Sequence, residues 1–122
     1  MTLLLDANVA VWWLSNRRRL RPQVVDTIAR SACLFSTASL LELTAKASTG
    51  RLIFTGSMKA DLARLCVWLP VTAPHALHVQ TLPRINNDPF DRVIVAQAMI
   101  EGLTLVTGDH LLADYGVPVL LT

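Results

Sequence analysis

Two carboxylates open one strongly apolar segment of this chain. Asp88 precedes Pro89, and Asp91 follows three residues after Asp88. Asp88 can cap a helix, proline suits the first helical position, and Asp91 then falls in the first turn. Residues 90–100 are apolar on nearly every side, which is typical of a buried helix. Carboxylates beside an apolar interior are costly unless a proton, a cation or hydrogen bonds compensate them.

Three further acidic side chains lie where predicted strands end. Asp6 follows the first predicted strand directly, Glu42 lies shortly after the second, and Asp109 follows a late strand and one glycine. Taken singly, each is more simply explained as a helix cap, and Glu42 would complete a capping box with Ser39. Together with the two carboxylates of the helix start, five of the nine acidic residues fall at junctions that a parallel sheet brings to one ligand-binding edge. We therefore expect an acidic pocket there.

Such a pocket favours a divalent cation. Close carboxylates repel one another, which raises the pKa of at least one of them unless a cation joins them. Mg²⁺ is typically held by one or two carboxylates, waters and substrate phosphate oxygens, and the hydroxyl of Thr107 or Ser39 could contribute through water. One metal ion lowers the pKa of a bound water, and a second, roughly 4 Å away, would steady the departing oxygen. The sequence thus favours metal-assisted hydrolysis of a phosphodiester.

Patterns for other kinds of site are missing. The three histidines show no nucleophile–base arrangement, and neither a glycine-rich phosphate loop nor a Gly-x-Ser-x-Gly elbow occurs. No Cys/His pair has zinc spacing, so Cys33 and Cys66 are expected to be buried thiols. A basic cluster near the N-terminus is interpreted either as a solvated loop or as a rim that meets a polyanion. This cluster consists of Arg17, Arg18, Arg19 and Arg21.

The elements that must position these side chains follow from the hydrophobic pattern. Short apolar runs predict strands at residues 2–5, 33–36, 69–72, 103–107 and 117–121. Periodicity and capping residues predict helices at residues 7–14, 22–31, 39–49, 57–67, 74–82 and 89–100, with a single turn at 110–114. Pro70 places the third strand at a sheet edge. The alternation predicts an α/β fold, a three-layer α/β/α sandwich with a central parallel sheet.

The composition indicates one folded domain that spans residues 1–122. Hydrophobic residues make up 52% of the sequence, and its length suits a single core of ordinary size. No apolar run approaches the roughly 18 residues of a membrane span. The N-terminus lacks the basic region and long apolar segment of a secretion signal. We expect a cytoplasmic protein without membrane association.

Five blocks of the sequence resemble, in order, the PIN-domain family and more narrowly the VapC-type toxins of bacterial toxin–antitoxin modules. The most specific block is Asp88-Pro89-Phe90-Asp91-Arg92, which Ala96-Gln97-Ala98 follows. The other blocks are Leu4-Leu5-Asp6, Thr37 to Leu43 with Lys46 and Gly50-Arg51-Leu52, Leu105 to Asp109, and Tyr115 to Val119. Together these blocks cover almost the whole chain.

The resemblance implies an Mg²⁺- or Mn²⁺-dependent endoribonuclease that cleaves single-stranded RNA. It carries the catalytic and metal-binding roles onto Asp6, Glu42, Asp91 and Asp109. Asp6 and Asp91 would be direct metal ligands, and Asp88 would be a supporting acid or a cap. The family also implies a small antitoxin that covers the active site, and homodimers within the toxin–antitoxin complex.

The chain departs from the family pattern at two points. Relatives often have Thr-His after the first aspartate, where this sequence has Ala7-Asn8, and a histidine in place of Asn86. Among the supporting residues, Lys46 is expected to pair with Glu42. Arg92 could hold a phosphate or form an internal ion pair. Two tryptophans in the first helix are interpreted as core or partner-groove residues rather than base-stacking platforms, and these are Trp12 and Trp13.

Two alternative functions from other classes remain open from the sequence alone. A phospho-accepting receiver domain is also α/β with an acidic Mg²⁺ pocket, but it needs a lysine after the late strand, and none lies between Arg92 and Thr122. A non-catalytic binding module could keep the acidic pocket for structure alone.

Overall fold

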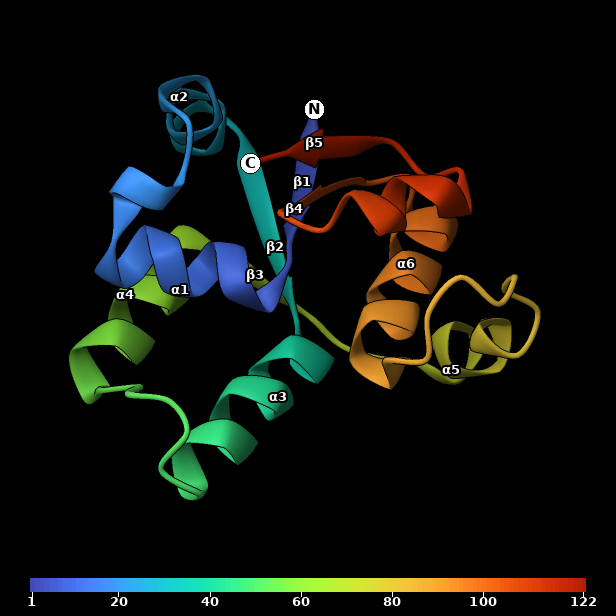
Figure 1. Cartoon of the computed structure of the whole chain (residues 1–122), viewed down its shortest axis with the longest axis horizontal. Coiled ribbons are helices and arrows are strands. Elements are labelled where there is room, and N and C mark those ends of the chain that lie inside the picture. The colour runs from blue at the N-terminus through green and yellow to red at the C-terminus, as the bar shows by residue number, and fades with distance from the viewer.

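The computed structural model describes residues 1–122 and is organised around a five-stranded parallel sheet (Figure 1). The strands are β1 (Thr2–Leu5), β2 (Ala32–Ser36), β3 (Val67–Leu69), β4 (Thr104–Thr107) and β5 (Val119–Leu121). Their order is β3-β2-β1-β4-β5, and every neighbouring pair is parallel. Helices cover both faces, so the predicted three-layer α/β/α fold is confirmed.

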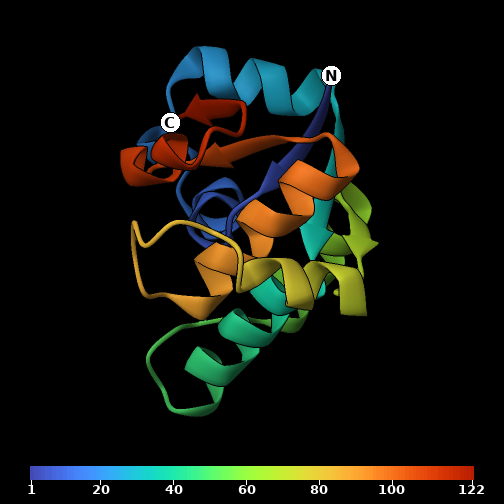
Figure 2. The same ribbon diagram turned by 90° about the vertical axis from the view of Figure 1, so that its right-hand side faces the viewer.

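The helices divide between the two faces of the sheet. One side carries α1 (Ala7–Ser15), α2 (Pro22–Arg30) and α4 (Gly56–Leu65), and the other carries α5 (Ala73–Val79), α6 (Pro89–Glu101) and the 3₁₀ helix η2 (His110–Tyr115). A short 3₁₀ turn, η1 (Arg17–Arg19), follows α1. Helix α3 (Thr37–Ser48) lies beyond the carboxyl ends of the strands, where it packs against both α1 and α6. Figure 2 shows α3 and the loop after it extending from the rest of the molecule.

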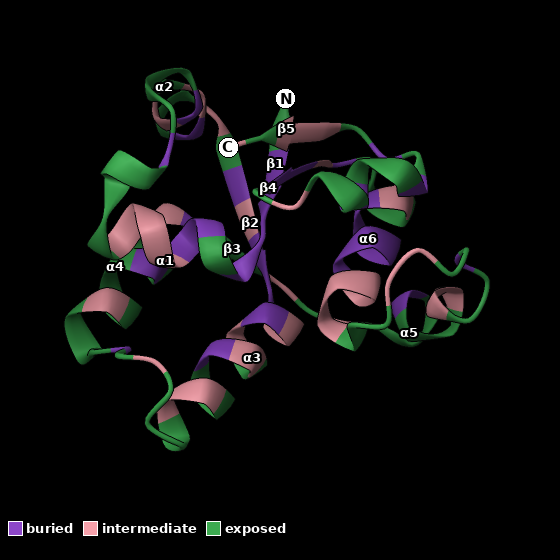
Figure 3. Ribbon diagram, viewed as in Figure 1, coloured by how far each residue is buried: buried purple, intermediate pink, exposed green.

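Strand β1 is the centre of the core. Leu3 and Leu5 point to one face, where they join a buried cluster with α1, α2 and α4, whereas Leu4 points to the other face and packs with α6. All three side chains are completely buried, and Figure 3 shows buried residues in the inner strands and along α6. A strand covered on both faces reads as a continuous apolar run. Its carboxyl end therefore delivers Asp6 to the middle of the sheet edge.

Helix α6 begins as predicted and is buried through its middle. Asp88 is its N-cap and Pro89 its first residue. Residues 94–98 are buried, but Ile100 is 43% exposed, so the expectation of burial on nearly every side holds only for the central turns. Gly102 adopts a left-handed conformation with φ of 67°, which favours glycine and turns the chain toward β4.

Several local predictions are wrong. The helix predicted at 74–82 ends at Val79, and the strand predicted at 117–121 begins at Val119. Two further cases have an identifiable cause. The N-cap of α3 is Ser36, whose hydroxyl accepts a hydrogen bond from the Ala38 amide, so Ser39 lies inside the helix and forms no capping box with Glu42. The third strand pairs through Val67–Leu69 rather than residues 69–72, and the preceding helix ends at Leu65. Pro70 has no amide hydrogen to donate, so the sheet uses the residues before it. That strand does lie at the sheet edge.

Three broader expectations can be compared with the fold. The receiver-domain alternative is wrong on topology, because flavodoxin-like receivers have the strand order 2-1-3-4-5. Cys33 and Cys66 are free, buried thiols, as predicted, and burial raises the pKa of Cys66 to about 12. None of the helices has the length and apolar character needed to span a membrane.

Candidate metal centre

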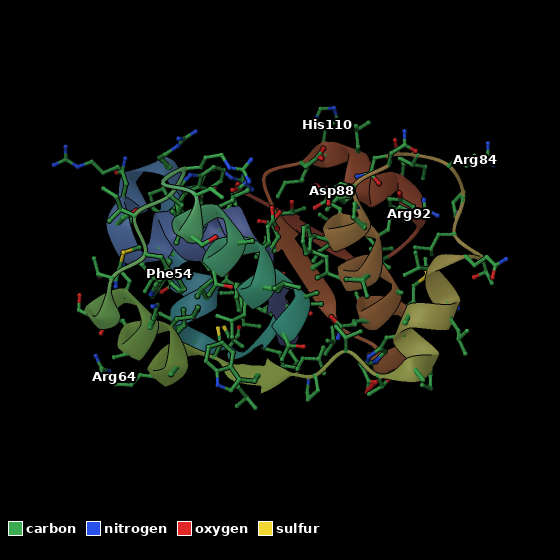
Figure 4. The ribbon with its side chains drawn as sticks, turned by 90° about the horizontal axis from the view of Figure 1, so that it is seen from below. Phe54, Arg64, Arg84, Asp88, Arg92 and His110 are labelled. Carbon is green, nitrogen blue, oxygen red and sulfur yellow. The ribbon has the colours of Figure 1, made fainter.

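The five predicted carboxylates line one cleft at the carboxyl end of the sheet. The cleft has a volume of about 170 Å³. Figure 4 looks onto this end of the molecule and shows Asp88 at the start of α6. The acidic lining consists of Asp6, Glu42, Asp88, Asp91 and Asp109, and Ser39 and Lys46 complete much of the remaining polar surface. The structure thus brings together residues that are up to 103 positions apart along the chain, from Asp6 to Asp109.

Asp6 is held by three hydrogen bonds at the junction of β1 and α1. Its Oδ1 accepts from the backbone amides of Asn8, at 2.8 Å, and Val9, at 3.2 Å. Its Oδ2 accepts from the hydroxyl of Thr107 at 2.6 Å. Burial raises the pKa of Asp6 above its ordinary value, although these hydrogen bonds oppose the change, and the nearby charge of Glu42 adds to it. Asp6 is therefore both the cap of α1 and a rigidly oriented wall of the cleft.

Thr107 connects two of the acidic residues. Its hydroxyl donates to Asp6 and accepts from the backbone amide of Asp109 at 3.0 Å. Asp109 in turn caps η2 through Oδ1, which accepts from the Leu111 amide at 3.0 Å. The single hydroxyl proton of Thr107 is used directly on Asp6. Thr107 therefore links the Asp6 carboxylate to the backbone that carries Asp109.

Asp91 carries the clearest electrostatic mark of a shared acidic site. Burial first, and then the neighbouring charges of four carboxylates, together raise the pKa of Asp91 to about 7. Those carboxylates are Asp88, Asp6, Glu42 and Asp109. Its Oδ2 accepts a hydrogen bond from the Asn86 side-chain amide at 3.1 Å. Bringing a cation into the cleft would relieve this repulsion.

Asn86 and Tyr115 support Asp91 and were not singled out by the sequence as site residues. The Tyr115 hydroxyl donates to Asn86 Oδ1 at 2.5 Å, which orients the Asn86 amide so that its nitrogen faces Asp91. The same hydroxyl accepts from the Asn86 backbone amide at 3.3 Å and from Arg92 at 3.2 Å. Tyr115 and Asn86 are 29 residues apart, so spacing could not have paired them. The one feature of the sequence that pointed to this pair is that position 86 is an asparagine, where relatives often have a histidine.

Arg92 has neither of the two roles considered for it. Its guanidinium points away from the cleft, as Figure 4 shows, and forms no ion pair. It donates instead to four backbone carbonyls, one at the end of α5 and three in the segment between α5 and α6, and to the Tyr115 hydroxyl. The carbonyls belong to Val79, Leu82, Pro83 and Asn86. Arg92 therefore holds the segment that carries Asn86.

Two further predicted residues, Lys46 and Asp88, also line the cleft. Lys46 Nζ lies 2.9 Å from Glu42 Oε2, which confirms the predicted pair and places the one cation among the lining side chains. Asp88 uses Oδ1 to cap α6, accepting from the amides of Phe90 at 2.8 Å and Asp91 at 3.3 Å. Its role as a cap is thus explained without a metal.

The chemistry of the donor set suits a hard divalent cation that retains water. Asp91, Asp109 and Glu42 each use one carboxylate oxygen on a protein donor, and their other oxygens make no protein hydrogen bond. No group of three acidic, histidine or cysteine side chains converges as a ready-made metal cage. Mg²⁺ is usually bound by only one or two carboxylates with several waters. The residues therefore fit a hydrated metal site rather than an all-protein cage.

Comparisons with known proteins give the family and the fold. A family model described as "PIN domain" matches residues 3–118. Comparison with curated proteins gave no significant match. The structure is similar to VapBC2 from Rickettsia felis bound to a promoter DNA fragment, with a TM-score of 0.75, 14% identity, and coverage of 99% of this chain and 98% of that chain.

Two further solved structures show the same fold. DNA-bound VapBC from Salmonella typhimurium aligns with a TM-score of 0.68 and 19% identity over 98% of this chain and 97% of that chain. FitAcB from Neisseria gonorrhoeae aligns with a TM-score of 0.61 and 21% identity over 96% of this chain and 95% of that chain. At these identities the likeness carries the architecture alone.

Proposed function

Because the chain belongs to the PIN domain family, we propose that it is a metal-dependent endoribonuclease and the toxin of a toxin–antitoxin pair. Proteins of this family are typically nucleases and generally metal-dependent. The observation that carries the proposal is the convergence of five carboxylates on one cleft, with the pKa of Asp91 raised to about 7. A fold needs no such concentration of like charge for stability, since its mutual repulsion is unfavourable.

The proposed reaction is attack of water on a phosphodiester of single-stranded RNA. One P–O bond forms, the bond to the departing oxygen breaks, and a proton moves from the attacking water to solvent while the departing oxygen is protonated. When bound, Mg²⁺ or Mn²⁺ would lower the pKa of water and offset charge on the phosphate oxygens. Asp91, Asp109 and Glu42 offer the free oxygens that would hold it. Asp6, fixed by Thr107, completes the acidic wall.

The proposed partner is a small antitoxin, with the toxin as a homodimer in the complex. Support comes from a similar solved structure, a toxin–antitoxin complex from Klebsiella pneumoniae, which aligns with a TM-score of 0.66 and 16% identity over 88% of this chain and 86% of that chain. The basic cluster at Arg17–Arg19 and Arg21 is an exposed surface that an acidic partner segment could also meet.

The decisive experiment combines metal removal with substitutions in the cleft. Purified protein should cleave single-stranded RNA with Mg²⁺ or Mn²⁺ and stop cleaving with EDTA. D6N and D91N should each lose at least about 100-fold in rate, because each removes a carboxylate from the site. D61N is the matched control, since Asp61 is an exposed acid paired with Arg64 away from the cleft.

Three outcomes would count against the proposal. Cleavage that EDTA does not affect would exclude a metal-dependent reaction, and full activity of D91N would exclude the cleft as its site. Absence of cleavage, together with stability unaffected by metal, would favour the non-catalytic binding module.

A further inference from the structure

Two shallower hollows adjoin the acidic cleft and lengthen it into a groove. One, of about 350 Å³, shares Asp6, Asn8 and Asp109 with the cleft. The other, of about 410 Å³, shares a separate set of residues, Glu42, Lys46, Asp88 and Phe90. Because the two shared sets do not overlap, the hollows open from different parts of the cleft. The groove therefore has a negative centre and two ends.

The first end has an aromatic ring beside one cation. It is lined by Trp12, Gly108 and His110. A Cβ atom at Gly108 would lie 3.1 Å from the Trp12 indole, so the absence of a side chain there allows this close approach. The Arg19 guanidinium carbon lies 4.6 Å from the Trp12 ring centroid. His110 is exposed at the start of η2, and Figure 4 shows it at the rim of this face.

The second end repeats this combination with other residues. Phe90, half-buried in the first turn of α6, supplies the ring, and Lys46 and Arg51 supply the charge. Arg51 is exposed and uses its Nε on the Thr49 hydroxyl at 3.1 Å, which leaves its two terminal nitrogens without a protein acceptor. Both ends of the groove thus offer an aromatic surface and a cation, although they come from different elements.

We propose that this groove binds a single RNA strand across the acidic cleft, with bases against Trp12 and Phe90 and flanking phosphates near Arg19 and Arg51. The inference rests on the proposed ribonuclease function and names the path of its substrate. Proteins that bind single strands combine a cationic track with rings on which bases stack. An acidic peptide would gain from the cations alone, because it has no bases to stack on the two rings. RNA uses both features, so the groove fits RNA better.

RNA binding can be measured without cleavage. Fluorescence anisotropy of a labelled single-stranded RNA should be measured with the D91N protein and with the double variants D91N/R19Q and D91N/R51Q. Each addition should weaken binding on the order of 3- to 10-fold and reduce the slope of log affinity against log salt by about 1. F90L should weaken binding about 5-fold or more, since a stacking ring is lost. R30Q and R64Q are matched controls, because both arginines are exposed and paired with acids on their own helices.

Photo-crosslinking locates the strand without altering either ring. RNA containing 4-thiouridine should crosslink to the peptides that contain Trp12 and Phe90. Affinities of R19Q and R51Q equal to those of R30Q and R64Q, or crosslinks confined to other peptides, would overturn the groove. Unchanged RNA affinity with loss of binding to an acidic antitoxin peptide would also overturn it. If wild-type protein binds RNA here but fails to cleave it with Mg²⁺ or Mn²⁺, the groove stands and the proposed function fails.

Discussion

At the scale of single residues, Asp91 links the electrostatics of the cleft to stability. Its folded-state pKa is about 7, against an ordinary value of 3.8. The folded protein therefore binds this proton more tightly than the unfolded chain does. In the metal-free protein, the stabilisation of the fold that comes from this tighter proton binding is fully present below a pH of about 3.8. It is lost as the pH rises through about 7. The charged form of Asp91 then destabilises the fold until a cation joins it.

The first prediction follows from the loss of stability that the raised pKa of Asp91 causes as the pH rises. In EDTA, D91N should be more stable than wild type at pH 8, on the order of 1–3 kcal/mol in the free energy of unfolding, because a neutral amide removes the buried charge. At pH 4.5 the difference should largely disappear. Urea denaturation at both pH values measures it, with D61N as an exposed control. An equal effect of D91N at both pH values would show that charge is not the cause.

Asn86 is the second residue whose role can be tested apart from activity. Its amide donates to Asp91 and is itself oriented by the Tyr115 hydroxyl. We infer that Asn86 is a positioning residue, since it orders the carboxylate proposed to hold the metal. Groups that orient a metal ligand commonly account for a 10- to 100-fold change in metal affinity.

The second prediction is therefore a loss of metal affinity. N86A should weaken Mn²⁺ binding by about 10-fold in calorimetry at pH 7, and Y115F should weaken it less, because the Asn86 amide remains but can rotate. N87A is the matched control, since Asn87 is the exposed neighbour in the same loop. If N86A and N87A bind Mn²⁺ equally, Asn86 does not position the ligand.

At the scale of elements, the hydrophobic pattern predicted which segments are buried. Predictions were wrong where two nearby residues could each cap a helix. Strand β1 matches its predicted bounds, since an uninterrupted apolar run covered on both faces has one interpretation. At α3 the sequence offers two serines, Ser36 and Ser39, and the capping-box spacing favoured the wrong one. Ser36 ends a strand with extended backbone, which is the conformation an N-cap requires. Only the end of β2 could have decided between them.

The segment between α5 and α6 depends on one side chain at this scale. Residues 80–88 contain no helix or strand, and the Arg92 guanidinium supplies five hydrogen bonds that tie this segment, the end of α5 and Tyr115 to α6. Lysine keeps the charge but has a single nitrogen and cannot reproduce the planar array. Arg84 lies exposed in the same segment, and Figure 4 shows its side chain pointing outward.

The third prediction uses Arg84 as a reporter. Trypsin should cut after Arg84 at least several-fold faster in R92K than in wild type, since loosening the segment increases the population of the open form that a protease can bind. Cleavage after Arg64, on α4, is the internal control, and the two rates can be followed by mass spectrometry in one digest. A uniform increase at both sites would mean global destabilisation rather than release of this segment.

At the scale of the whole molecule, the sequence predicted which residues meet better than how they are held. Parallel topology alone brought Asp6, Glu42 and Asp109 to one edge, because all strand exits lie there. The supporting network could not be predicted. Thr107 reaches Asp6 across 101 positions and Tyr115 reaches Asn86 across 29, and such contacts leave no periodic trace in a sequence. Trp12, interpreted as core or partner groove, also lines a hollow beside the cleft.

The last prediction treats the cleft as a site where metal binding and folding are coupled. The raised pKa values of Asp6 and Asp91 mean that the apo fold carries unfavourable charge near neutral pH. A cation that binds only the folded state stabilises it by RT ln(1 + [L]/Kd), about 2.7 kcal/mol at a hundredfold excess over Kd. Mn²⁺ at that excess should therefore raise the melting temperature at pH 7.5, and EDTA should reverse the rise. D91N should start from a higher metal-free melting temperature and gain little from Mn²⁺, whereas D61N should behave as wild type. An equal rise in wild type and D91N would place the metal outside the cleft.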